Sequence, residues 1–581
     1  MRFLLLLLTL LLFTACRQAR PEAVTATSTP AADLIAKKVI ADQAGIATAH
    51  PLASRIGLDI LKQGGNAVDA AIATQFALAV CYPVAGNIGG GGFMVIRNAD
   101  GTSDALDFRE MAPAAANADM YLDEKGDVIK GLSTFGHLAA GVPGSVGGMV
   151  AAYEKYSKLK DWKRLVQPAI TLAIEGVELT TLEATRLNSK SDDFRKANTR
   201  PTRFVTGSEW KNGDILKQPE LAEVMKAIRD QGFDGFYKGW VADSLVAEMQ
   251  RGKGIITKED LASYEAKWRT PIIGQYKGYE IISMPPPSSG GIALQQLLSS
   301  IEPYDIAQYG FHSVDAIHLM IEAERRVYAD RASHLGDSDY VDVPIDGLID
   351  DTYNADRMQS FDPLKASTSA DIDAGTPAAK ESEQTTHFSI VDADGNAVSL
   401  TTTINTAYGS KVVVGGAGFF LNNEMDDFSA KPGVPNYFGL VGNEANSIQP
   451  QKRMLSSMTP TIVADQDDNL KIVVGTPGGS TIITSVFQTI VNILDFDMTA
   501  SEATQACRFH HQWLPDMVYY EPDCFDQALI DSLTAMGHNL QSRKTVTTSG
   551  MIGKVETILV RDDGLLEVAA DKRGDDTAMG F

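Results

Sequence analysis

Cysteine is scarce in this sequence, and its scarcity limits the kinds of site that the chain can build. Only four cysteines occur among 581 residues, at Cys16, Cys81, Cys507 and Cys524. Beyond Cys16 the remaining three form an odd, sparse set, which predicts neither a disulfide framework nor a CxxC metal site. Cys81 ends the apolar run that starts at Phe76, so we interpret it as a core residue.

Long basic runs and internal repeats are also missing. The formal net charge is −23 and the isoelectric point is about 4.8, so the chain should repel the phosphate backbone of nucleic acids. No unit of about 20 to 50 residues recurs, which argues against solenoids and propellers. With 44% hydrophobic and 22% charged residues, the sequence has the composition of a globular protein with a large core.

The one long apolar run that stands out lies at the N-terminus. Arg2 precedes the run from Phe3 to Phe13, which is too short to span a bilayer but is typical of a signal peptide, assigned to residues 1–15. The sequence therefore predicts export, to a periplasm.

The residues before Cys16 are similar to a bacterial lipobox, so lipidation of Cys16, with a lipid anchor to the membrane, and ordinary signal cleavage are both open. Residues 16–35 are expected to form a flexible tether.

The spacing of apolar residues predicts both helices and strands. Two helices are expected between 51 and 80, separated at Gly64-Gly65-Asn66, and others at 144–156, 162–176, 221–231, 240–251, 291–301, 313–335, 481–494 and 525–536. Strands are expected at 93–96, 386–391, 397–404, 419–421, 470–474, 554–560 and 565–569. The glycine run 86–92 precedes a strand, which favours close backbone packing over nucleotide binding. This mixture predicts a layered α/β or α+β fold.

The segment 365–384 is poor in large apolar residues and is expected to be exposed and mobile. Strand character begins directly after it, at Gln384-Thr385-Thr386. A threonine hydroxyl is a weak nucleophile without a base beside it, but an N-terminal threonine carries its own base, an α-amine with a pKa of about 8. Cleavage between Gln384 and Thr385 would therefore place the nucleophile and its base in one residue.

The residues after Thr385 predict a β-hairpin whose loop contains Gly395. If the loop has three residues with Gly395 in the left-handed conformation, residue 392 faces 396 and Thr385 faces Thr403, with Asn405 on the same face. A two-residue loop would place Ile404 opposite Thr385 instead. The position of Thr403 therefore depends on the type of turn.

Gly478-Gly479-Ser480 lies where a predicted strand ends and a helix begins. Backbone N–H groups at such a turn converge with the positive end of the helix, which suits an oxyanion hole. A tight turn with Ser480 as the helix N-cap explains the same residues equally well. The sequence leaves both interpretations open.

Three carboxylates gather at Glu424, Asp426 and Asp427. They could bind a metal ion or a substrate ammonium, but no histidine is close in sequence and the EF-hand spacing is missing, so a solvated turn is the simplest interpretation. Five further polar residues show no nucleophile-elbow motif and no spacing that pairs them for catalysis: Ser456, Ser457, His387, His510 and His511.

Seven longer motifs together carry a resemblance. They are Asp107-Phe-Arg-Glu-Met-Ala-Pro, Met284-Pro-Pro-Pro-Ser-Ser-Gly-Gly, Gln384-Thr-Thr-His-Phe-Ser, Asp394-Gly-Asn-Ala-Val, Leu421-Asn-Asn-Glu-Met-Asp-Asp-Phe-Ser, Lys452-Arg-Met-Leu-Ser-Ser-Met and Gly475-Thr-Pro-Gly-Gly-Ser. In this order they resemble the γ-glutamyltranspeptidase family, and the resemblance extends from about Ala36 to Phe581.

The resemblance implies the N-terminal-nucleophile hydrolase fold, an α+β four-layer αββα sandwich. One precursor would cut itself into a large chain, residues 36–384, and a small chain, residues 385–581. Thr385 would attack the γ-amide of glutathione or a related γ-glutamyl compound, and the resulting ester would pass to water or to an amino acid or dipeptide acceptor. The family chemistry implies no cofactor and no metal ion.

The resemblance also implies roles for single residues. Gly478 and Gly479 match oxyanion-hole glycines, and Thr403 matches a threonine that hydrogen-bonds the nucleophile. Six residues match binders of the glutamyl head group, the first three at its α-carboxylate and the others at its α-ammonium: Arg109, Ser456, Ser457, Asn405, Glu424 and Asp427.

One position departs from the family pattern. Members with a lid over the pocket often carry a tyrosine that hydrogen-bonds the residue equivalent to Asn405, but Phe438 stands at that place. Either Tyr437 takes over this role or the lid is looser, which leaves the acceptor preference open. Two rival interpretations remain, a glutaryl (cephalosporin) acylase of the same fold and an uncleaved binding lipoprotein.

Overall fold

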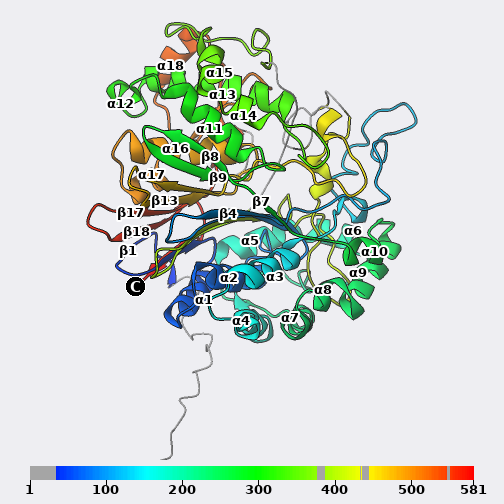
Figure 1. The fold of residues 1–581 in the computed structure, drawn as a ribbon. Coiled ribbons are helices and arrows are strands. Elements are labelled where there is room, and N and C mark those ends of the chain that lie inside the picture. Colours follow the sequence, from blue (N-terminus) through cyan, green and yellow to red (C-terminus); the bar gives the residue numbers. More distant parts are fainter. Residues whose placement is uncertain (1–33, 376–385, 432–433, 435–436, 438–443, 546–549) are drawn as a thin grey trace, which may run out of the picture.

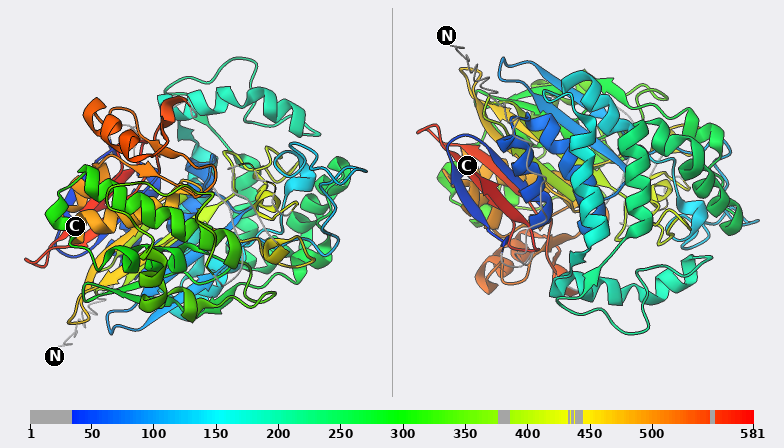
Figure 2. Two further views of the ribbon diagram at one scale, coloured as in Figure 1. Left: turned by 90° about the horizontal axis from the view of Figure 1, so that it is seen from above. Right: turned by 90° about the horizontal axis from the view of Figure 1, so that it is seen from below.

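Two stacked β-sheets form the centre of the molecule, and a layer of helices covers the outer face of each sheet (Figure 1). The computed structural model describes residues 34–375, 386–431, 434, 437, 444–545 and 550–581. Seen from above and from below, different sets of helices lie over the strands (Figure 2). The predicted αββα sandwich is therefore confirmed.

Each sheet has seven strands, and every neighbouring pair within it is antiparallel. The first sheet has the order β1 (Lys38–Ala41), β18 (Leu566–Ala570), β17 (Glu556–Val560), β13 (Leu470–Gly475), β12 (Thr461–Ala464), β9 (Tyr279–Ser283) and β8 (Ile272–Tyr276). The second has the order β19 (Thr577–Gly580), β2 (Gly45–Thr48), β10 (Thr386–Val391), β11 (Ala397–Thr403), β3 (Gly91–Arg97), β4 (Ser103–Asp107) and β7 (Lys267–Arg269). Both sheets interleave strands from before and after residue 385.

Helices from the first half of the chain cover the second sheet. The layer contains α1 (Pro51–Lys62), α2 (Ala67–Cys81), α3 (Ser145–Tyr156), α4 (Trp162–Glu175), α7 (Pro219–Gln231), α8 (Asp234–Tyr237), α9 (Gly239–Gly252) and α10 (Lys258–Ala262). Gly64, with a φ of 87°, ends the α1 segment, and Asn66 starts α2 with a capping box to Asp69. Every residue of α2 is buried because neighbouring helices and the sheet enclose it.

The other helical layer covers the first sheet. It contains α11 (Gly290–Ile301), α13 (Val314–His334), α15 (Asp351–Met358), α16 (Thr481–Leu494), α17 (Ala500–Gln505) and α18 (Gln527–Met536). Shorter elements complete the chain: α5 (Thr181–Ser189), α6 (Ser191–Ala197), α12 (Ile306–Tyr309), α14 (Ile345–Leu348), β5 (Val177–Glu178), β6 (Ile215–Leu216), β14 (Phe509–His510), β15 (Val518–Tyr520) and β16 (Leu540–Ser542). The predicted longer helices all form, with ends within two residues of the expected ones.

The glycine run brings three backbones together beside the hairpin. A Cβ atom on Gly90 would lie 1.9 Å from the carbonyl oxygen of Thr403, and one on Gly89 would lie 2.1 Å from that of Phe420. No side chain fits at such distances, so only glycine allows β3 to enter the sheet here. The predicted close packing is confirmed, and it fixes the end of β11.

Two predictions about local structure were wrong. Residues 419–421 do not form a strand, since only the isolated bridge between Val413 and Phe420 occurs there. The described part of the segment 365–384 is not wholly exposed, because Ala366, Ser369 and Ile372 are buried. Residues 376–384 lie outside the described part, so their expected mobility stays a prediction.

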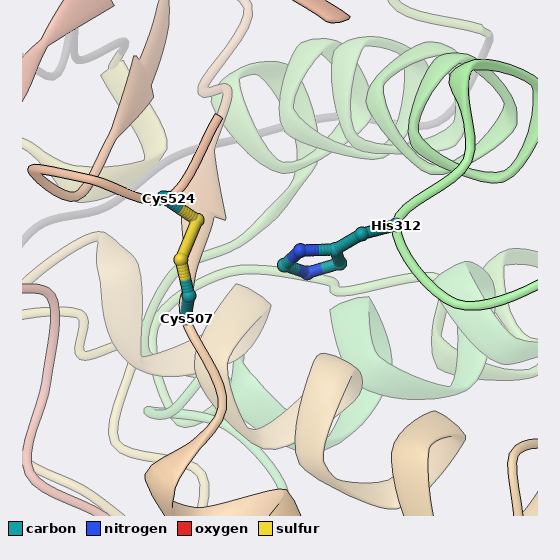
Figure 3. Close-up of side chains that lie close together, drawn as sticks. All are labelled: His312, Cys507 and Cys524. Atoms are coloured by element: carbon teal, nitrogen blue, oxygen red, sulfur yellow. A yellow bond between two sulfur atoms is a disulfide. The ribbon is translucent and has the colours of Figure 1, made fainter. Parts of the chain in front are cut away.

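The structure pairs Cys507 with Cys524 in a disulfide, and the imidazole of His312 lies beside it (Figure 3). The prediction that no disulfide could be assigned missed this pair, because the two cysteines are 17 residues apart and carry no recognisable spacing. Cys81 is a buried free thiol, as expected. Within the described ranges, no helix combines the length and apolar character needed to cross a membrane.

Candidate active site

The turn of the β10–β11 hairpin sets the register on which the predicted site depends. Gly395 has a φ of 88°, and the backbone N–H of Asp392 donates to the carbonyl of Asn396 at 3.0 Å. Thr386 consequently pairs with Thr402. The three-residue loop is confirmed and the two-residue alternative is wrong. Thr385 and Gln384 lie outside the described residues, so the pairing of Thr385 with Thr403 stays a prediction.

Thr403 and Asn405 are held at the end of β11 by their neighbours. The Oγ1 atom of Thr403 accepts the backbone N–H of Asn405 at 2.7 Å, and Asn405 adopts a φ of 65°. The side-chain amide of Asn405 donates to the carbonyl of Asn423 at 2.9 Å. Its Oδ1 atom is buried and has no hydrogen-bond partner among the described residues. A buried acceptor of this kind is costly unless a ligand donates to it.

Arg109, Glu110, Glu424 and Asp427 form a fully buried group that we call the ionic cluster. Arg109 follows β4, whereas Glu424 and Asp427 lie on one turn of 3₁₀ helix, Glu424–Asp427. The Arg109 guanidinium donates to both Glu424 and Asp427. The solvated turn preferred from the sequence is therefore wrong. The predicted α-carboxylate binder and the two predicted α-ammonium binders contact one another directly.

Burial dominates the electrostatics of the ionic cluster. It raises the pKa of Asp427 well above its ordinary value despite the attraction of Arg109. It also raises the pKa of Glu110 to about 8. Arg109 Nη1 lies 3.7 Å from Glu110 Oε2, and the positive charge of Arg109 and a side-chain hydrogen bond with Glu424 offset part of this effect on the pKa of Glu110. Burial acts to lower the pKa of Arg109, but Glu424, Asp427 and Glu110 together raise it above its ordinary value.

Ser456 and Ser457 are buried on a segment that runs beside the residues before α11. Ser288 and Ser456 form a parallel bridge, and the backbone N–H of Ser289 donates to the Ser456 carbonyl at 2.7 Å. The Oγ atom of Ser456 accepts the backbone N–H of Met458 at 3.2 Å. The Oγ atom of Ser457 accepts a hydrogen bond from the Arg331 guanidinium. The Leu455 carbonyl, one residue earlier, accepts from Arg109 at 3.1 Å, which ties this segment to the ionic cluster.

Gly478, Gly479 and Ser480, which we call the glycine turn, join β13 to α16. Gly478 has a φ of 151° and is partly buried, and Gly479 has a φ of 68° and is buried. Ser480 makes no side-chain cap to α16, and its hydroxyl donates to Gln512 Oε1 at 2.7 Å. The Tyr328 hydroxyl donates to the Ser480 carbonyl. Ser480 therefore occupies the predicted N-cap position but makes no capping hydrogen bond, and the oxyanion-hole interpretation stays a prediction.

The remaining predicted site residues lie apart from these contacts or outside the described residues. Tyr437 is 63% exposed and lines a cavity of about 400 Å³ with Ser133, Asp426 and Lys431. Its backbone N–H donates to Asp426 Oδ2 at 3.3 Å. Phe438 and Cys16 lie outside the described residues, so the effect of Phe438 on a lid and the lipidation of Cys16 stay predictions.

The histidines first interpreted as structural are buried. His387 Nδ1 and Thr401 Oγ1 lie 2.9 Å apart, and burial lowers the pKa of His387 to about 3. Within the described part of the chain, His318, Glu322 and His538 lie close enough to share a metal ion. The oxygens of Glu322 already accept from Arg325, Arg326 and Ser367, which disfavours a cation there.

The reasoning from sequence missed two residues at this site. Glu110 directly follows Arg109 inside the motif Asp107-Phe-Arg-Glu-Met-Ala-Pro, so its position beside Arg109 was available from the sequence. Arg331 sits in the predicted helix 313–335, and only the folded structure brings it to Ser457.

The model of the family described as Gamma-glutamyltranspeptidase matches residues 53–581. The glutathione hydrolase proenzyme of Escherichia coli (strain K12) is 46% identical over 546 residues, which cover 94% of this chain and 93% of that protein. The proenzyme of the same name from Pseudomonas sp. (strain A14) is 49% identical over 483 residues, covering 83% and 84%. The solved structure of cephalosporin acylase from Bacillus halodurans is 27% identical, with a TM-score of 0.81 over 97% of this chain and 99% of that one. Because the matched residues include the hairpin, the glycine turn and the ionic cluster, the chain belongs to the γ-glutamyltranspeptidase family.

Proposed function

We propose that this chain is the precursor of a γ-glutamyl hydrolase and transferase that acts on glutathione and related compounds. The precursor cuts itself between Gln384 and Thr385 into a large chain, residues 36–384, and a small chain, residues 385–581. The ionic cluster is the observation that carries the proposal. The ionic cluster lies next to the end of β11. Thr403, the last residue of β11, pairs with Gly91, and Glu110 of the cluster packs against Gly91.

The charges of the ionic cluster match the head group of an amino acid. One guanidinium faces three carboxyl groups, all of them buried. With Glu110 protonated and Glu424 and Asp427 both ionised, the cluster carries one negative charge in excess, which is unfavourable in a dry interior. A substrate α-ammonium supplies the missing positive charge. A glutaryl group lacks that ammonium, so the cluster favours γ-glutamyl substrates over glutaryl amides.

The proposed reaction needs no group beyond the chain and its substrate. The Thr385 hydroxyl attacks the γ-carbonyl carbon while the Thr385 α-amine takes the hydroxyl proton. Backbone N–H groups of Gly478 and Gly479 stabilise the negative oxygen of the tetrahedral intermediate. The C–N bond then breaks, and the proton passes from the α-amine to the leaving amine. Water or an acceptor amine releases the γ-glutamyl ester by the same steps in reverse.

The first test changes the proposed nucleophile. Thr385→Ala should leave a single full-length chain on a denaturing gel and lower turnover of γ-glutamyl-p-nitroanilide by about 10⁴-fold or more, as loss of a nucleophile does. A matched control is Thr386→Val, because Thr386 Oγ1 is buried without a hydrogen-bond partner among the described residues. That variant should cleave and turn over normally. In the wild type, a mass spectrum should show a small chain that begins at Thr385.

Two outcomes would overturn the proposal. A wild-type protein that stays in one piece and binds γ-glutamyl compounds without turnover would be a binding protein. A wild type that hydrolyses glutaryl-p-nitroanilide faster than γ-glutamyl-p-nitroanilide would instead be an acylase, like the cephalosporin acylase from Bacillus halodurans.

Export to a periplasm, with a lipid on Cys16, forms part of the same proposal. The support is the sequence order of Arg2, the apolar run from Phe3 to Phe13, and Cys16. Metabolic labelling with a tagged fatty acid should mark the polypeptide that runs from Cys16 to Gln384, and Cys16→Ser should abolish the label. An unlabelled wild type whose N-terminus has been cut would show ordinary signal cleavage instead.

A further inference from the structure

One histidine and two cysteines that the proposed reaction does not use lie together beside the helices that cover the first sheet. His312 lies between α12 and α13, Cys507 between α17 and β14, and Cys524 between β15 and α18. Their possible ligand atoms all lie within 4.8 Å of one another. The imidazole of His312 points toward the disulfide (Figure 3). Imidazole nitrogen and cysteine sulfur are the ligands that zinc prefers in proteins.

The imidazole of His312 is held by aromatic rings. It stacks on Phe311, with ring centres 3.9 Å apart, and makes T-shaped contacts with Phe509 and Phe525 at 6.1 and 6.2 Å. Among the described residues, neither ring nitrogen of His312 makes a hydrogen bond. A nitrogen of this ring can therefore bind a metal ion without breaking an existing bond.

The two cysteine segments are tied together by contacts other than the disulfide. Glu521 Oε2 accepts the backbone N–H of Arg508, next to Cys507, at 3.0 Å, and the Glu521 carbonyl accepts the backbone N–H of Cys524 at 3.2 Å. Both carboxylate oxygens of Glu521 also accept from Arg573 at 2.6 Å. These contacts keep the two sulfurs close when the S–S bond breaks. They also occupy the Glu521 carboxylate, so a fourth ligand comes from solvent.

The redox state of the cysteines decides how many ligands this group offers. In the disulfide the two sulfurs are bonded to each other and uncharged, so only His312 remains as a strong ligand. Reduction by two electrons gives two thiols, and their thiolates bind metal ions. All three residues are partly exposed, so a small thiol can reach the bond.

We propose that His312, Cys507 and Cys524 form a zinc site when a low-molecular-mass thiol reduces their disulfide. The thiolate of one thiol molecule attacks one sulfur and releases the other cysteine as a thiolate, and a second thiol molecule displaces the first, which leaves as the disulfide of the two molecules. Zn²⁺ then binds both cysteines and His312, two thiol protons pass to solvent, and water takes the fourth position. The inference does not depend on the proposed function, although glutathione is one such thiol.

The first test compares zinc binding by the oxidised and the reduced protein. The purified protein is reduced with glutathione, freed of small thiols by anaerobic gel filtration, and titrated with Zn²⁺ against a chromophoric chelator. The reduced wild type should bind one more equivalent of Zn²⁺ than the oxidised wild type. Cd²⁺ in place of Zn²⁺ should give the sulfur-to-metal charge-transfer absorption of thiolate ligation. Alkylation followed by mass spectrometry should find Cys507 and Cys524 as thiols only after reduction.

Substitutions test each ligand. His312→Phe keeps a ring against Phe311 but removes the nitrogen, so the Kd of the reduced protein for Zn²⁺ should rise by at least about tenfold, the lower end for residues that only support a ligand. His312→Asn suits the left-handed φ of 54° and repeats the measurement if His312→Phe does not fold. Cys507→Ser combined with Cys524→Ser should abolish the extra equivalent. Cys81→Ala, which removes the buried free thiol, is the matched control and should bind zinc as the wild type does.

The remaining outcomes would overturn the inference. Equal zinc binding by the oxidised and reduced wild type, or a disulfide that glutathione leaves intact, would remove the dependence on a thiol. Wild-type affinity in both His312→Phe and His312→Asn would remove His312 as a ligand. A wild type that shows thiol-dependent zinc binding but no turnover of γ-glutamyl-p-nitroanilide would overturn the proposed function and support the zinc site.

Discussion

The ionic cluster and the glycine turn have different proposed roles, and they are built from different kinds of chemical group. The ionic cluster uses charged side chains that are fully buried and come from segments 315 or more residues apart. The glycine turn uses backbone groups within three consecutive residues, of which Gly478 is partly exposed. Recognition of a charged head group thus depends on long-range packing, whereas the proposed oxyanion stabilisation depends on local conformation.

This difference separates the expected effects of substitution. A change in the ionic cluster leaves buried charges without partners, so it acts on stability as well as on binding. A change in the glycine turn alters the direction of backbone N–H groups, so it acts mainly on the rate of the chemical step. Four substitutions test this separation.

The largest effect is expected for Arg109→Met. Removing the guanidinium leaves Glu424, Asp427 and Glu110 buried without their cation, which should cost about 3–5 kcal/mol of stability. The melting temperature at a fixed scan rate is the measurement, with Arg195→Met as the exposed control. Adding Glu424→Gln and Asp427→Asn should restore much of the melting temperature but not the activity. An unchanged melting temperature in the single variant would contradict the view that these charges depend on one another.

Gly478→Ala should act on the rate instead. A Cβ atom there would lie 2.6 Å from Thr481 Oγ1 at a φ of 151°, so the turn must shift. Loss of one oxyanion donor lowers kcat by about 10²–10³-fold, and we expect a fall of this size with a KM changed by less than about threefold. Gly564→Ala is the matched control, because it has a φ of 81° but open space around it. A similar fall in kcat for both variants would remove the special role of Gly478.

Glu110→Gln tests the electrostatics of the cluster through pH. Burial raises the pKa of Glu110 from 4.5 to about 8, so the folded chain keeps a proton that the unfolded chain releases. Its contribution to stability is full below pH 4.5 and is lost as the pH rises to about 8. Glutamine is neutral at every pH. Between pH 5 and 9 the free energy of unfolding of the variant should therefore rise relative to that of the wild type by on the order of 1–3 kcal/mol. Melting temperatures that stay parallel across this range would show that Glu110 is ionised in the folded chain.

The smallest effect is expected for Ser480→Ala. The substitution removes a hydrogen bond to Gln512, whose Oε1 atom still lies 2.9 Å from His510 Nε2. Tyr328 still donates to the Ser480 carbonyl. We expect a loss of about 0.5–1.5 kcal/mol in stability and a fall in kcat of less than about fivefold. A fall as large as that of Gly478→Ala would make Ser480 part of the oxyanion site.

The parts of the site that the sequence predicted are those set by local rules. The β10–β11 register is one of the two that the turn residues around Gly395 allowed, and α16 has the bounds that periodicity indicated. The glycine turn was recognised because a strand, three small residues and a helix follow one another.

The parts that were missed are set by contacts between distant segments. No local pattern distinguishes a buried turn at 424–427 from a solvated one, because the burial comes from Arg109 and the layers around it. The same holds for Arg331 and for the pairing of Cys507 with Cys524. The sequence around a single polar side chain on a helix does not indicate which distant residue that side chain contacts after folding.

The interleaving of strands in both sheets has a consequence for the two products of cleavage. In the second sheet β10 lies between β2 and β11, and in the first sheet β12 lies between β13 and β9. Neither polypeptide has a complete sheet without the other. Dilution should therefore not separate them: size-exclusion chromatography at nanomolar concentration should give one peak, and the two pieces should part only when both denature together.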